Sequence, residues 1–80
     1  MPTFLLQHRH DPGECAASFA AWLGFPSPLR HKSAASTCLA GGHAVWWRVQ
    51  AEDAVAALAL LPAFVARRTI PIEVRDVEIP

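Results

Sequence analysis

The chain carries little charge and no excess of either sign. Lys and Arg together number 7, Asp and Glu together number 7, and charged residues make up 18% of the 80 residues. A nucleic-acid-binding domain needs surplus Lys and Arg, because these side chains replace the counterions of the phosphate backbone. The even balance therefore argues against a nucleic-acid partner.

Cysteines and long apolar runs are also scarce. Cys15 and Cys38 are the two cysteines, whereas a small secreted domain held together by disulfides usually carries more. The longest apolar stretch, AVAALALLPAFVA, is too short to span a membrane and contains a proline. The opening MPTFLLQHRH lacks the basic region of a secretory signal peptide. These absences predict a cytoplasmic protein with reduced thiols and no membrane partner.

Apolar residues, by contrast, are plentiful, at 52% of the chain. This fraction argues against disorder and predicts a packed core. The length suffices for one domain, so residues 1–80 are expected to form a single unit. A domain this small and apolar is expected to leave some apolar surface exposed, which favours association with a second copy of the chain.

The hydrophobic periodicity predicts strands over residues 3–10, 36–40, 43–50 and 70–79, and helices over residues 11–23 and 52–61. Asp11 is expected to cap the first helix, with Pro12 at its first position and Glu14 three residues after the cap. Gly24 is expected to end that helix. The buried stripe of the helix is expected to consist of Cys15, Phe19, Trp22 and Leu23.

The order βαββαβ is that of the ferredoxin-like fold, an α+β arrangement with two helices on one face of a four-stranded antiparallel sheet. The first and third strands are expected in the centre, with the second beside the third and the fourth beside the first. The Gly-Gly pair at 41–42 is expected to form a two-residue hairpin turn, which pairs Cys38 with Val45. The first strand is expected to pair with the third through Phe4 and Val49.

This register divides the side chains between two faces of the sheet, because they alternate along each strand. The more apolar face, expected to meet the helices, carries Phe4, Leu6, His8, His10, Cys38, His43, Val45, Trp47 and Val49. The half-polar face, expected to be open, carries Leu5, Gln7, Arg9, Thr37, Leu39, Ala44, Trp46 and Arg48. Two open faces packed together would form a dimeric α/β barrel.

The βαββαβ order, the Gly-Gly turn and the apolar first strand that runs into HRHDP resemble the dimeric α/β-barrel superfamily. The resemblance is one of pattern and covers nearly the whole chain. It implies a ferredoxin-like fold and a homodimer. The superfamily includes small stress-responsive barrels, monooxygenases and metal-binding members, so it implies no single chemistry. No catalytic motif of its enzymes matches this sequence.

The first functional hypothesis is non-enzymatic binding of a small ligand within such a dimer. Gln7, Arg9, Trp46 and Arg48 combine an aromatic floor with two guanidiniums and an amide, which suits a small planar or anionic molecule. The same four residues equally suit an ordinary dimer seam, where Trp and Arg are common anchors.

The second hypothesis is transition-metal binding. The expected register gathers imidazole and thiolate groups at one end of the inner face, the ligands that Zn²⁺, Cu and Ni²⁺ accept. The candidate ligands are His8, His10, His43, Cys38 and Cys15. The alternative is structural, because histidines near strand ends often bond loop carbonyls and cysteines pack as small apolar residues.

Two further features leave alternatives open. His8 or His10 is a candidate general base of a cofactor-free monooxygenase- or isomerase-like enzyme, although no acid/base pair accompanies them. The proline-bounded loop PLRHKS carries Arg30, His31 and Lys32. These charges either steer an anion toward the sheet or belong to a plain solvated loop.

Overall fold

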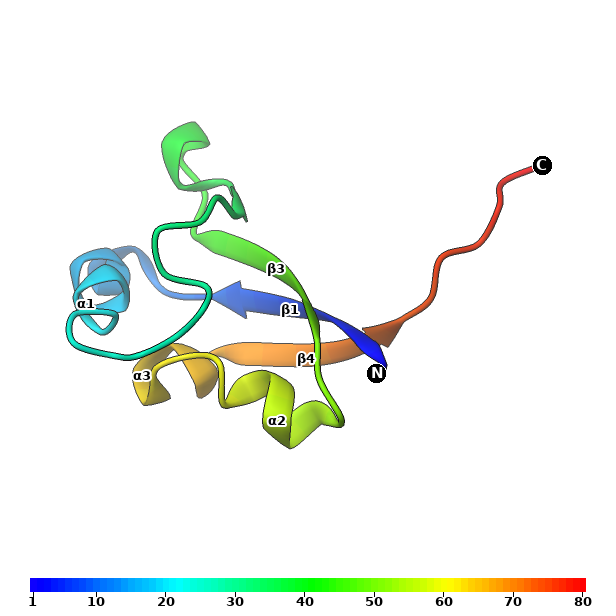
Figure 1. Ribbon diagram of the computed structural model, residues 1–80. Coiled ribbons are helices and arrows are strands. Elements are labelled where there is room, and N and C mark those ends of the chain that lie inside the picture. Colours follow the sequence, from blue (N-terminus) through cyan, green and yellow to red (C-terminus); the bar gives the residue numbers. More distant parts are fainter.

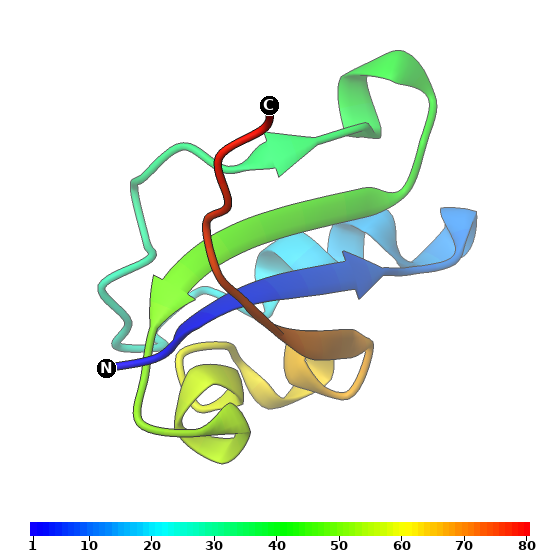
Figure 2. The same ribbon diagram turned by 90° about the vertical axis from the view of Figure 1, so that its right-hand side faces the viewer.

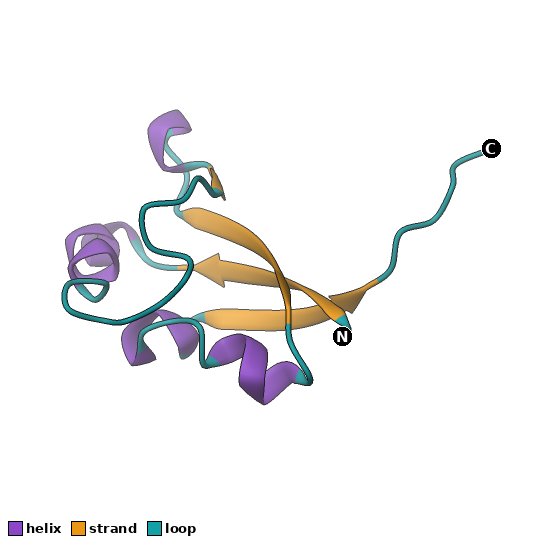
Figure 3. Ribbon diagram, in the orientation of Figure 1, coloured by secondary structure: helices purple, strands orange, loops and turns teal.

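The computed structural model describes residues 1–80 as a four-stranded antiparallel sheet with three short α-helices (Figure 3). The strands are β1 Thr3–Arg9, β2 Ala35–Ser36, β3 Ala44–Gln50 and β4 Thr69–Val74. The α-helices are α1 Cys15–Ala20, α2 Ala54–Leu58 and α3 Ala63–Ala66, and two 3₁₀ turns are η1 Pro12–Glu14 and η2 Cys38–Ala40. The expected α+β class is confirmed, and none of the helices has the length and apolar character needed to cross a membrane.

The strands lie side by side in the order β2-β3-β1-β4, with the long strands β1 and β3 in the centre (Figures 1 and 2). The register expected between these two strands is confirmed, because Phe4 lies opposite Val49 and His8 lies opposite Val45. After β4 the chain leaves the sheet on the side away from α1 (Figure 1). The face of the sheet that carries Leu6 and Trp47 packs against the helices and is called the helix-covered face. The opposite face, which carries Gln7 and Trp46, is called the open face.

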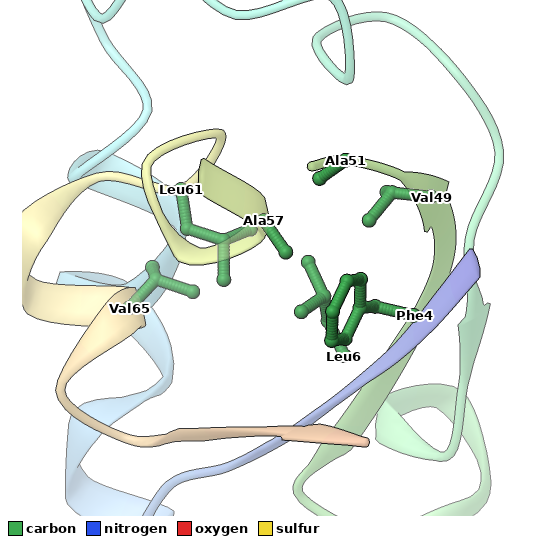
Figure 4. Packing of buried hydrophobic residues seen from close by; sticks show 7 residues of the cluster. All are labelled: Phe4, Leu6, Val49, Ala51, Ala57, Leu61 and Val65. Carbon is green, nitrogen blue, oxygen red and sulfur yellow. The ribbon is translucent and has the colours of Figure 1, made fainter. Parts of the chain in front are cut away.

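The core lies between α2, α3 and one face of the two central strands (Figure 4). Its seven buried residues are Phe4, Leu6, Val49, Ala51, Ala57, Leu61 and Val65. Asp53 begins α2 by accepting a hydrogen bond from the Ala56 N–H at 2.8 Å, and Pro62 interrupts the helical run before α3. The even-numbered residues of β1 face this core, as the expected register requires.

The expected hairpin between the second and third strands is wrong. β2 contains only two residues, and Ser36 rather than Cys38 lies opposite Val45. The strands are joined by a seven-residue connection, residues 37–43. Its ends are closed by the Thr37 N–H, which donates to the Ala44 carbonyl at 3.0 Å, and by the Ala44 N–H, which donates to Thr37 Oγ1 at 3.2 Å. Cys38 consequently begins η2 and is not part of the sheet.

Both glycines of this loop have a structural reason other than a two-residue turn. Gly41 ends η2 in the left-handed region, with φ of 86°, where a side chain is strained. Gly42 lies so close to Thr37 that a Cβ would clash with Thr37 Oγ1. The Gly-Gly pair therefore ends a tight turn and allows a close approach.

The elements are shorter than expected, and the buried stripe of the first helix is partly wrong. Asp11 and Glu14 do form the N-terminal cap as expected, yet α1 ends at Ala20. Phe19 and Leu23 are 59% and 78% exposed instead of buried. The second helix begins at residue 54 rather than 52, and β4 ends at residue 74 rather than 79.

Candidate functional site

The corner between β1 and α1 brings the chemistry-bearing side chains together. The His10 N–H donates to the His43 carbonyl at 3.0 Å and so continues the pairing of the central strands beyond β1. The chain then turns through η1 and places Cys15 at the start of α1. Because Pro12 fixes its own φ and Asp11 caps the turn, the position of Cys15 is set by local sequence.

Three ligand-type atoms meet at this corner. Cys15 Sγ lies 3.3 Å from His10 Nε2 and 3.1 Å from His43 Nδ1. All three atoms lie within 4.8 Å of one another. His10 is buried, whereas Cys15 and His43 are half-buried, so the group has one side in the protein and one toward solvent.

His8 fixes the proton positions behind this group. Its Nδ1 lies 3.3 Å from both the Val65 carbonyl and Thr69 Oγ1. The Thr69 hydroxyl already donates to Val65 O at 2.7 Å, so both partners act as acceptors and the His8 Nδ1 must carry a hydrogen. Burial lowers the pKa of His8 below its ordinary value of 6.5, which keeps the ring neutral. Its Nε2 is therefore a bare acceptor.

The orientation of His10 follows from that of His8. His8 Nε2 lies 2.8 Å from His10 Nδ1, so His10 Nδ1–H is the donor of this hydrogen bond. In neutral His10 the other nitrogen, Nε2, then carries a lone pair directed at Cys15 and His43. A histidine ligand whose second nitrogen is held by a fixed acceptor is the usual arrangement at protein metal sites.

The two sulfur–nitrogen distances of this group are close to those around a bound ion. With Zn–S and Zn–N bonds of about 2.3 and 2.05 Å, tetrahedral coordination separates sulfur from nitrogen by about 3.5 Å. The observed separations of 3.3 and 3.1 Å need only a few tenths of an ångström of expansion. One thiolate and two imidazoles are a ligand set that Zn²⁺ and copper both accept.

An ion pair holds this corner against α3 and β4. Glu14 Oε2 accepts hydrogen bonds from Arg68 Nη2 at 2.7 Å and Nε at 3.1 Å, and Glu14 Oε1 accepts one from the Asp11 N–H at 3.0 Å. The Arg68 guanidinium also stacks 3.7 Å from the Phe64 ring centroid. The Arg68 hydrogen bonds, followed by the Asp11 N–H, lower the pKa of Glu14 to about 2.

The structure brings together some of the expected metal ligands and not others. His10, Cys15 and His43 form the group, and His8 lies one hydrogen bond behind it. Cys38 lies outside the group, because the longer loop moved it out of the sheet. A polar cleft of about 770 Å³ borders His10 and His43 and is lined by seven residues, none of them apolar.

The four residues expected to bind a ligand all lie on or beside the open face. The Trp46 Nε1–H donates to Gln7 Oε1 at 3.4 Å, while Arg48 forms an ion pair with Asp76 at 2.7 Å. Arg9 is exposed and borders the polar cleft. One cleft includes Arg9 alone of the four and another includes Arg48 alone, so their joint binding role stays a prediction.

Sequence reasoning missed a second cavity, of about 570 Å³, between α1 and the helix-covered face of the sheet. Ser18 lines it and is buried, in a helical position between Cys15 and Trp22. The spacing 15, 18, 22 matches one helix face as well as the expected stripe does, and this signal was available in the sequence. In comparisons with known proteins, no family model matches the chain, and neither a curated protein nor a solved structure matches it significantly.

Proposed function

We propose that this protein binds a transition-metal ion, Zn²⁺ in the first instance, through His10 Nε2, Cys15 Sγ and His43 Nδ1. The observation that supports the proposal is the convergence of these three atoms within 4.8 Å, on a histidine whose lone pair is already turned toward the site. Three protein ligands leave a fourth coordination position for water or another small ligand. The half-exposed side of the group, next to the polar cleft, is where that position would lie.

The rival enzymatic hypothesis gains less from the same geometry. Both nitrogens of His8 are engaged, one with Val65 O and Thr69 Oγ1 and the other with His10. A general base needs a free nitrogen within reach of a substrate proton. His10 has its only free lone pair directed at Cys15. The geometry thus favours ligation over general-base catalysis by either histidine.

The test is titration of metal-free protein, purified without a histidine tag, with Zn²⁺ and Co²⁺. We expect about one equivalent of Zn²⁺ per chain, a higher Tm with Zn²⁺ and a thiolate-to-cobalt charge-transfer absorption. Cys15→Ser should abolish that absorption and weaken Zn²⁺ binding by more than about 100-fold, because loss of a direct ligand exceeds the cost of losing an outer partner.

The second cysteine provides the matched control. Cys38→Ser makes the same chemical change outside the three-atom group and should leave the stoichiometry and the cobalt spectrum unchanged. Retention of less than roughly a tenth of an equivalent of Zn²⁺, with no change in Tm, would overturn the proposal. Equal losses in the two serine variants would also overturn it.

We also propose that the domain is ferredoxin-like and pairs through its open face as in the dimeric α/β barrels. The strand order β2-β3-β1-β4, with helices between the first two strands and before the last, supports the fold. Exposed apolar side chains on the open face support the pairing, since Ile70 and Ile72 are 59% and 38% exposed opposite Gln7 and Leu5. We further propose that a small ligand binds at the seam of this dimer and that the protein is cytoplasmic.

A further inference from the structure

The cavity beneath α1 has the size and lining of a small-molecule site. Its volume of about 570 Å³ falls within the range of about 300–1,000 Å³ typical of such pockets. Ten of its 17 lining residues are hydrophobic, so its occupant needs a largely apolar body. The loop that follows α1 runs past this side of the sheet to β2 (Figure 1) and supplies the outer wall.

Apolar side chains border the cavity without being covered by the protein itself. Phe19 and Leu23, on and just after α1, are 59% and 78% exposed although both line the cavity. Trp22 and Trp47 pack against each other beside them, with ring centroids 5.7 Å apart. An apolar ligand would remove this surface from water, which stabilises the complex in proportion to the area buried.

The charge of the lining is one-sided. Arg30, His31 and Lys32 follow one another in the outer wall, and none of the 17 lining residues is Asp or Glu although the chain contains 7 of these. The Arg30 and Lys32 side chains make no ion pair. This arrangement complements an anion and selects against a cation.

A buried hydroxyl supplies an independent observation. Ser18 lines the cavity, is 4% exposed, and its Oγ has no hydrogen-bond partner. An unpaired buried hydroxyl is costly, and native proteins rarely leave one without a partner. A ligand oxygen in the cavity would provide the missing hydrogen bond.

We propose that this cavity binds a small amphipathic organic acid, with its apolar body between α1 and the sheet, its carboxylate at Arg30 and Lys32, and an oxygen at its inner end paired with the Ser18 hydroxyl. The site adjoins the His10–Cys15–His43 group, because His8 and His10 line the cavity whereas Cys15 and His43 do not. The proposed contacts of the acid do not include a metal ion, so binding is measured in the presence of EDTA, which removes any ion held by that group.

The experiment compares sodium decanoate, 1-decanol and 10-hydroxydecanoate by calorimetry and by the fluorescence of the cavity tryptophans. We expect decanoate to bind more tightly than 1-decanol. Arg30→Gln should weaken decanoate by about 2- to 5-fold, as for the loss of one exposed ion pair. Arg75→Gln removes the same charge away from the cavity and should change nothing. Equal affinity for acid and alcohol, or no binding of either, would overturn the proposal.

Two further variants test the wall and the inner end. Leu23→Glu places a carboxylate on the wall and should weaken decanoate by more than about 10-fold through repulsion and lost apolar contact. Val55→Glu is its control, because Val55 is also 78% exposed but lies on α2 outside the cavity.

Wild type should prefer 10-hydroxydecanoate to decanoate by about 2- to 10-fold, the value of one hydrogen bond, and Ser18→Ala should remove that preference. Unchanged decanoate binding in Leu23→Glu, or a preference that persists in Ser18→Ala, contradicts the assignment.

Discussion

At the scale of single residues, the buried His8 orients the ring of His10, although His8 itself is not one of the proposed metal ligands. It keeps the His10 lone pair turned toward Cys15, while its own nitrogens face Val65, Thr69 and His10. His8→Leu should weaken Zn²⁺ binding by about 10- to 100-fold without changing its stoichiometry, since His8 is an outer partner and not a ligand. Competition with a chelator of known affinity measures this change.

A second histidine serves as the control for that prediction. His31→Asn removes an imidazole from the loop beside the cavity, and asparagine tolerates the left-handed φ of 64° found there. We expect its Zn²⁺ affinity to equal that of wild type. If His8→Leu also binds Zn²⁺ like wild type, His8 has no orienting role.

Gly42 is required because its α-hydrogen fits against Thr37 where a Cβ would not. In Gly42→Ala the new methyl group would clash with Thr37 Oγ1 and disturb the hydrogen bond that this atom accepts from the Ala44 N–H. We expect the variant to lose about 1–3 kcal/mol in the free energy of unfolding, measured in urea. Gly13→Ala has nothing within 4 Å of its Cβ and should be neutral or slightly stabilising.

At the scale of elements, the Glu14–Arg68 ion pair fastens η1, and with it the start of α1, to the end of α3. Because the folded pKa of Glu14 is about 2 and its ordinary value is 4.5, the pair stabilises the fold above about pH 4.5 and loses this effect as the pH falls toward 2. Metal-free Glu14→Gln should unfold a few degrees below wild type at pH 7, and the gap should narrow below about pH 4.5.

The control for the ion pair is Glu52→Gln, since Glu52 is exposed and forms no ion pair. Thermal unfolding followed by circular dichroism between pH 7 and pH 3 compares the three proteins. A gap between Glu14→Gln and wild type that stays constant across this range would contradict the assigned stabilisation.

The connection between β2 and β3 explains why element boundaries were harder to predict than faces. A Gly-Gly pair between apolar runs fits a two-residue turn, but it equally fits a left-handed 3₁₀ terminus at Gly41 followed by a close approach at Gly42. The contact between Gly42 and Thr37 distinguishes these two turn types. That contact depends on how the chain folds back on itself, which the Gly-Gly pair and its apolar neighbours do not indicate. The actual loop shifts the pairing of Val45 by two residues, from Cys38 to Ser36.

At the scale of the whole molecule, a shift by an even number leaves every side chain on its own face, because side chains alternate with period two. His8, His10 and His43 belong to the pairing of β1 with β3, whose register is the expected one, so they come together as expected although Cys38 is displaced. The cavity beneath α1 was not predictable in the same way. It depends on how far the short α1 and its following loop stand from the sheet, which periodicity does not encode.

The same division of faces makes a prediction about assembly. Trp46 lies half-buried on the open face, in one cross-strand row with Gln7 and the exposed Ile70. If two open faces pack together, Trp46→Glu buries an unpaired carboxylate at the seam, which costs several kcal/mol and should weaken dimerisation by more than about 100-fold. Light scattering at micromolar concentration should give a dimer for wild type and a monomer for the variant, with the circular dichroism of both alike.

Leu39→Glu, a similar change at a fully exposed residue of η2 outside the sheet, should remain dimeric. A monomeric wild type, or a dimeric Trp46→Glu, means that the open face does not mediate association.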